Sequence, residues 1–124
     1  MRDTIRRLPD AELEVMQALW ACDGPVTRAD LEEKLTQTHP MATTTLLTLL
    51  TRLKDKGFVS VQPEGRSRVY APLVTQEAYL AAQSHRFLHQ LCGGKVSVLA
   101  SALCDSGLSK EDLEELRELL KEGD

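Results

Sequence analysis

The chain has 124 residues and a mass of 13.8 kDa, so it forms one or two small domains. Hydrophobic residues make up 42% of it and aromatic residues only 4%, which predicts a core of leucine, valine and alanine. The net charge of −4 argues against a uniformly basic nucleic-acid-binding protein. There is no long apolar run, so we expect no membrane insertion, no secretory signal and a cytoplasmic location.

Charge is unevenly distributed along the chain. Residues 1–74 carry ten basic and ten acidic side chains, whereas residues 75–124 carry five basic and nine acidic ones. Residues 52–68 carry five basic and two acidic side chains. The sequence therefore predicts a basic patch in the middle of the chain and an acidic C-terminal part.

The first helix is expected to begin near Asp10, with Leu13, Met16 and Leu19 at core spacing, and to end before residues 23–25. Val26 predicts a very short strand. Thr27 then caps a second helix, and an acid three residues later completes a capping box. The expected core positions of this second helix are Ala29, Leu31 and Leu35, and it closes at His39-Pro40.

A third helix is predicted over residues 42–56. Its leucines repeat at helical spacing, and Gly57 is well placed to end it in the left-handed conformation. The core leucines are Leu46, Leu49, Leu50 and Leu53, and the basic last turn holds Arg52, Lys54 and Lys56.

Two strand-like runs follow, over residues 58–62 and 66–71, joined by a loop that contains glycine. Three helices and a hairpin in this order predict a winged helix-turn-helix domain over residues 1–74. The expected fold class is mainly α with a small β-wing.

Residues 72–75 are expected to form a hinge before a C-terminal helical domain over residues 75–124. Helices are predicted over residues 76–92 and 96–104, and a last acidic helix is capped by Ser109 with Asp112. Three short helices cannot bury their own apolar stripes, so we expect this domain to pair with a second copy of the chain. The expected dimerisation residues are Leu80, Phe87, Leu88, Leu91, Val98, Leu99, Leu103, Leu113, Leu116 and Leu120.

The third helix presents hydroxyl groups on the side opposite its leucines. Threonine is a mediocre helix former, but its hydroxyl and methyl groups suit base edges and the thymine methyl in the DNA major groove. The predicted DNA-binding residues of this helix are Thr43, Thr44, Thr45, Leu47, Thr48, Thr51 and Arg52. Two alternatives stay open: Leu47 packs internally, or Arg52 forms an internal salt bridge.

Three further arginines are predicted to contact DNA phosphates. Arg28 begins the second helix, which crosses the DNA backbone in this fold. Arg66 and Arg68 are two residues apart in a strand, so we expect them to project to the same side of the wing.

Metal or redox chemistry is the less favoured interpretation. His85, His89 and Cys92 share one face of the predicted fourth helix, a spacing found in metal sites, but the same face suits a dimer interface. The three cysteines, which include Cys22 and Cys104, are far apart and are expected to be reduced and mostly buried. We therefore predict no metal site and no cofactor. No catalytic constellation is present, so we expect no enzyme.

The sequence resembles the BlaI/MecI family of penicillinase and methicillin-resistance repressors. The resemblance lies in residues 8–16 with Leu19-Trp20, residues 45–53 and 56–58 of the predicted recognition helix and its end, residues 70–74, and residues 109–120. It implies a cytoplasmic homodimeric repressor on a palindromic operator of double-stranded DNA. It also implies release through cleavage by a membrane metalloprotease sensor.

Three departures from the family pattern are visible. Thr44 and Leu47 stand where the family often has a lysine and an arginine, which implies a different operator. Residues 98–103 lack the Asn-Phe pair at which the antibiotic repressors are cut. The C-terminus lacks the paired C-x-C motifs of copper-responsive relatives.

The sequence thus predicts a homodimeric transcriptional repressor that occupies a pseudo-palindromic operator and is released by a signal that the residues do not identify. Two alternatives are a metal- or redox-responsive regulator of the same fold and a winged-helix protein-interaction module without DNA binding.

Overall fold

A computed structural model describes residues 5–122 of the chain. It has two compact units, Met1–Gln83 and Ser84–Asp124, and each is described here by itself. The division falls inside helix α4 (Gln76–Gln90), nine residues beyond the predicted domain boundary. The reason is that the first two turns of α4 bury Tyr79 and Ala82, so the first unit keeps them.

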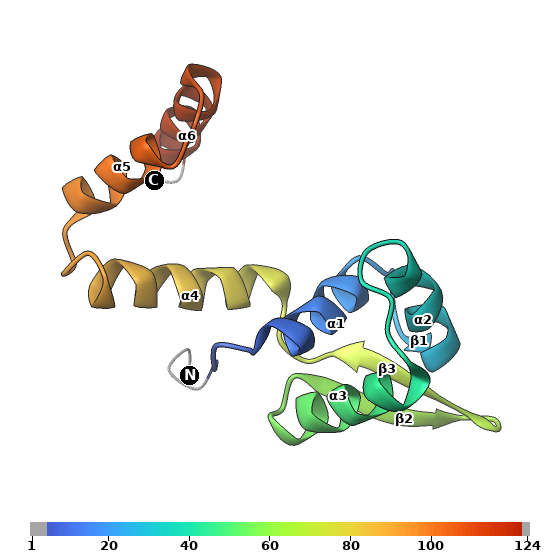
Figure 1. Cartoon of the computed structure of the whole chain (residues 1–124). Helices are drawn as coiled ribbons and strands as arrows, with labels where there is room; N and C mark the ends of the chain where they lie inside the picture. Colours follow the sequence, from blue (N-terminus) through green and yellow to red (C-terminus); the bar gives the residue numbers. More distant parts are fainter. Residues whose placement is uncertain (1–4, 123–124) are drawn as a thin grey trace. The chain divides into compact units, whose positions relative to one another are not determined.

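Three helices and a small sheet build the first unit (Figure 1). The helices are α1 (Asp10–Trp20), α2 (Arg28–Thr36) and α3 (Thr43–Asp55), close to the predicted positions. Each turns one apolar stripe inward, and the four predicted core leucines of α3 are almost fully buried. The innermost side chains are Val15, Met16, Leu19, Leu31, Leu35, Leu46, Leu50, Leu53, Phe58 and Val59.

Helix α2 begins with the predicted capping box. The backbone N–H of Asp30 donates to Thr27 Oγ1 at 3.2 Å, and the backbone N–H of Thr27 donates to Asp30 Oδ2 at 3.2 Å. The prediction that Ala29 is a core position was wrong, because this residue is exposed. It lies about 200° around the helix from Leu31, which faces the core.

Helix α3 ends as predicted, at a glycine in the left-handed conformation. Gly57 has a φ of +82°. The N–H of Phe58 donates to the carbonyl of Leu53 at 2.9 Å, and the N–H of Gly57 donates to the carbonyl of Lys54 at 3.0 Å. These two bonds are those of a Schellman motif, which turns the chain directly from α3 into the sheet.

The sheet is antiparallel, with strands β1 (Val26–Thr27), β2 (Val59–Glu64) and β3 (Ser67–Pro72) in the order β1-β3-β2. The loop between β2 and β3 is one residue shorter than predicted, and it begins later in the chain than predicted. The structure has a two-residue turn, Gly65-Arg66, between the paired residues Glu64 and Ser67. Pro63 is tolerated in β2 because this strand lies at an edge of the sheet.

An aromatic cluster anchors the beginning of α4 in the first unit. The ring of Tyr79 lies 5.7 Å from that of Trp20 and 6.0 Å from that of Phe58. The Tyr79 hydroxyl accepts a hydrogen bond from the backbone N–H of Leu8 at 2.9 Å. The indole N–H of Trp20 donates to the carbonyl of Val74 at 2.9 Å, so the segment before α4 is fixed to α1 as well.

The second unit contains the end of α4, then α5 (Val96–Asp105) and α6 (Lys110–Glu122). Gly93 and Gly94, both with positive φ, separate α4 from α5. Ser109 and Asp112 form the predicted capping box at the start of α6. From Gly93 to Lys121 the structure has no buried residue. Within residues 5–122, no helix is long and apolar enough to cross a membrane.

Candidate nucleic-acid interface

The outer face of α3 is polar and uncovered. All seven α3 residues that were predicted to meet DNA are exposed, while the leucines between them are buried. Leu47 is 40% exposed, so it does not pack in the core. A helix that turns its apolar stripe inward and a row of threonines outward has the form of a recognition helix.

Two of these threonines bond back to their own helix. Thr48 Oγ1 donates to the carbonyl of Thr44 at 3.0 Å, and Thr51 Oγ1 donates to the carbonyl of Leu47 at 3.0 Å. The hydroxyl hydrogens are therefore occupied, while the oxygen lone pairs stay available as acceptors. Such a face can accept hydrogen bonds from base amino groups and contact thymine methyl groups.

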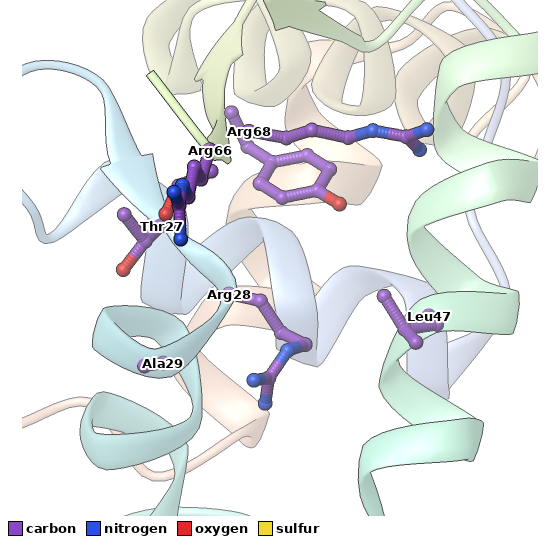
Figure 2. Close-up of a pocket in the computed structure, with 8 residues that line it drawn as sticks. Thr27, Arg28, Ala29, Leu47, Arg66 and Arg68 are labelled. Atoms are coloured by element: carbon purple, nitrogen blue, oxygen red, sulfur yellow. The ribbon is translucent and has the colours of Figure 1, made fainter. Parts of the chain in front are cut away.

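A pocket of about 420 Å³ joins this face to α2 and to the hairpin (Figure 2). Arg28 reaches it from the first turn of α2, Arg66 from the hairpin turn and Arg68 from β3. Leu47 lines it from α3. The full lining is Thr27, Arg28, Ala29, Leu47, Arg66, Ser67, Arg68 and Tyr70. Three guanidinium groups around one opening suit the phosphates of a nucleic-acid backbone.

Arg66 and Arg68 do not lie in the same strand, in contrast to the expectation from the sequence. They were expected on the same side of one strand, but Arg66 lies in the turn and only Arg68 lies in β3. Both nevertheless line the same pocket.

A carboxylate belongs to this surface as well. Glu32 of α2 accepts a hydrogen bond from Arg28 Nη1 at 2.6 Å, and its second oxygen accepts one from Thr43 Oγ1 at 2.5 Å. The hydrogen bond from Thr43, with the bond and the charge of Arg28, lowers the pKa of Glu32 from 4.5. A lowered pKa means that the stabilising bonds of the carboxylate are fully formed above pH 4.5 and are lost only as the pH falls through the lowered value.

The basic side chains at the end of α3 differ in their surroundings: two are exposed, and one forms an ion pair. The Arg52 side chain is exposed and makes no ion pair with any described residue, so the alternative of an internal salt bridge has no support. Lys54 is exposed as well. Lys56, which was predicted in the same basic last turn, is half-buried, and its ammonium group is paired with Glu12, a buried carboxylate of α1.

The row of possible metal ligands in α4 does not assemble. The rings of His85 and His89 lie 4.3 Å apart, whereas Cys92 is buried. Among residues 5–122, no three His, Cys, Asp or Glu side chains are close enough together to hold a metal ion. All three cysteines are free, and Cys104 is exposed rather than buried.

The predicted dimerisation residues fall into two groups. Leu88, Leu99, Leu103, Leu113 and Leu116 are half-buried, and Leu80, Phe87, Leu91, Val98 and Leu120 are exposed. Val96 and Leu119, which the prediction omitted, are also exposed. Leu80 and Phe87 are seven residues apart on α4, and Leu91, one residue past the end of the helix, continues this stripe four residues after Phe87.

Sequence reasoning missed Glu12 and Glu32. The spacing of Arg28 and Glu32, four residues apart with opposite charges, was a visible signal for their ion pair. Contacts of Glu32 with α3, and of Glu12 with Lys56, join residues far apart in sequence, and no local pattern indicates them.

The polar recognition helix, the arginine-lined pocket and the hairpin wing define a winged-helix DNA-binding protein. Residues 8–122 match the sequence model of the penicillinase repressor family, and the chain belongs to this family of transcriptional repressors, which are not enzymes. The chain is 34% identical to the penicillinase repressor of Bacillus licheniformis over 119 residues, which is 95% of this chain and 92% of that protein. The resemblance to BlaI/MecI is thereby confirmed.

Two solved structures resemble the first unit. The solution structure of the DNA-binding domain of the repressor BlaI has a TM-score of 0.53 and 33% identity, and it covers 60% of this chain and 90% of that one. Monomeric Bacillus licheniformis BlaI in complex with the blaP half-operator has a TM-score of 0.51 at the same identity and coverage.

Proposed function

We propose that the chain represses transcription as a homodimer that occupies a pseudo-palindromic DNA operator in the cytoplasm. The unit that ends near Gln83 binds one half-site, and the helices after it join two copies. The observation that carries the proposal is the shared pocket, which is lined by Leu47 of the recognition helix, Arg28 of α2 and the two arginines of the wing. The half-operator complex of BlaI supports the assignment, because BlaI is similar to this chain in its DNA-binding domain.

The proposed division of labour follows from the charges. Base edges are read by the exposed threonines and Leu47, while Arg52, Arg66 and Arg68 meet phosphates. Arg28 lines the same pocket, but its phosphate contact is weaker because Glu32 holds its guanidinium group. Phosphate contacts set register and salt dependence and carry no sequence information. Each half-site offers few basic groups, so tight binding needs two half-sites and hence two copies of the chain.

Fluorescence anisotropy on the chain's own promoter fragment, measured over a range of salt concentrations, tests the proposal. We expect tight binding with a steep salt dependence. Arg52→Ala should make the slope of log K against log salt shallower by about one, since it removes one phosphate contact.

Arg117→Ala is the matched control, because Arg117 is exposed on α6 and paired with Glu114. It should leave the slope unchanged. Binding that does not discriminate the promoter from random DNA would contradict the proposed function, and equal slopes for wild type and Arg52→Ala would remove Arg52 from the interface.

A further inference from the structure

Glu32 is an acidic group on a surface that otherwise attracts phosphates. Its side chain is 26% exposed, and it lies one helical turn after Arg28 on α2. DNA is densely negative, so each carboxylate near the backbone weakens the attraction that drives binding to any sequence. An acidic side chain in this position therefore lowers the affinity for DNA, unless its contacts with neighbouring residues favour binding in another way.

Both oxygens of the carboxylate are used, and they join two different parts of the surface. One oxygen holds the guanidinium of Arg28, a group that lines the arginine pocket. The other oxygen holds the hydroxyl of Thr43, the first residue of the recognition helix. Helix α3 has no side-chain cap of its own at Ala42, so this bond from α2 ties down its first turn.

The contacts have opposite consequences on random DNA and on an operator. On random DNA, affinity depends on the number of cationic side chains that are free to contact phosphates. A guanidinium group held by a carboxylate contributes less to this affinity. On an operator, affinity also requires that α3 enters the groove in one register, so that its side chains meet the base edges. A bond that fixes the start of α3 favours the operator alone.

We propose that Glu32 is a specificity-determining positioning residue, which restrains Arg28 from indiscriminate phosphate contact and fixes the start of the recognition helix. This inference rests on the proposed DNA-binding function. A glutamate is already ionised near neutral pH, and the hydrogen bonds from Thr43 and Arg28 lower the pKa of Glu32 further.

Glu32→Gln tests the proposal, with Glu33→Gln as its matched control. Glu33 is the next residue of α2, it is exposed, and its side chain contacts neither Arg28 nor Thr43. Both variants remove one negative charge. Anisotropy titrations on the promoter fragment and on a random duplex of equal length give the ratio of the two affinities at each salt concentration.

For Glu32→Gln we expect several-fold tighter binding to random DNA, with a salt slope steeper by about one because Arg28 is released. The ratio of promoter to random affinity should fall about tenfold. Glu33→Gln should strengthen binding to both duplexes equally and leave the ratio unchanged. Circular dichroism establishes that each variant is folded.

Glu32→Asp separates geometry from charge, because it keeps the carboxylate but is too short to hold both partners. It should lower the ratio without any change in net charge. Glu32 variants that leave the ratio at the wild-type value would overturn this inference alone. A wild-type chain that does not discriminate between the duplexes would overturn the proposed function, and the inference with it.

Discussion

Glu12 and Lys56 connect the first turn of α1 to the C-terminal end of the recognition helix. The Glu12 side chain is only 3% exposed, and Lys56 is the one described cation that pairs with it. A buried carboxylate is costly unless a cation and hydrogen bonds satisfy it, so the pair works as a unit. It takes one lysine away from the DNA-facing surface and uses it to hold α3 against α1.

We expect Glu12→Gln to lower the free energy of unfolding by about 3 kcal/mol, because it leaves the mostly buried ammonium of Lys56 without its partner. Urea denaturation at fixed protein concentration measures this change. Glu14→Gln is the control in the same helix. Among residues 5–122 the Glu14 carboxylate forms an ion pair only with His39, at 3.4 Å on the surface, so its loss should cost less than about 0.5 kcal/mol. Equal effects of the two variants would show that the buried pair contributes no more than a surface pair.

Tyr79 packs the beginning of α4 against the other helices of the first unit. It is 4% exposed, it lies between Trp20 and Phe58, and its hydroxyl receives the N–H of Leu8. Leu80, the next residue, is 55% exposed. Two neighbouring residues of α4 thus have different roles: Tyr79 packs in the core, and Leu80 belongs to the stripe proposed to contact a second copy of the chain.

Tyr79→Phe should destabilise the first unit by about 1–3 kcal/mol, because it leaves the buried N–H of Leu8 without an acceptor while the ring is kept. Thermal or urea unfolding checks this value. Tyr70→Phe is the matched control, since Tyr70 is also buried but its hydroxyl makes no hydrogen bond among the described residues. A Tyr79→Phe protein as stable as Tyr70→Phe would mean that the hydroxyl contributes nothing.

Most elements of the first unit could be predicted because their signals are local. The capping residues Thr27 and Asp30, the leucine stripe of α3 and Gly57 each act within a few neighbouring residues. The hairpin turn was misplaced because Pro63 suggests a loop, whereas the edge position that allows it in a strand is a property of the whole sheet.

The candidate site could be predicted only in part, for the same physical reason. Exposure of the α3 threonines follows from helical periodicity. The pairing of Lys56 with Glu12, and the bond between Glu32 and Thr43, depend on how α1, α2 and α3 pack together. Side chains brought together by packing leave no periodic pattern in the sequence.

Helices α5 and α6 have no hydrophobic core of their own. They contain 10 and 13 residues, and isolated helices of that length are marginal in water. Their leucines, like Leu91 just after α4, stay exposed or half-buried in one chain. We therefore expect these helices to be stabilised mainly by a second copy of the chain.

Phe87→Glu should weaken the proposed dimer by about 2 kcal/mol, roughly thirtyfold in dissociation constant, because it places a charge in the apolar stripe of α4. Sedimentation velocity over a concentration series measures the effect. His89→Glu adds the same charge to the same helix, on an exposed residue about 200° around it from Phe87, and should leave the dimer intact. A Phe87→Glu chain that associates like the wild type would exclude this stripe from the interface.

The absence of any buried residue from Gly93 to Lys121 also has a consequence for gene dosage. If two chains must meet before either completes its fold, the amount of active species follows the square of the free chain concentration. Where most chains are single, a twofold dilution during cell growth would remove roughly three quarters of the paired form. A promoter under such control would respond steeply to the rate at which the chain is synthesised, without any small molecule being sensed.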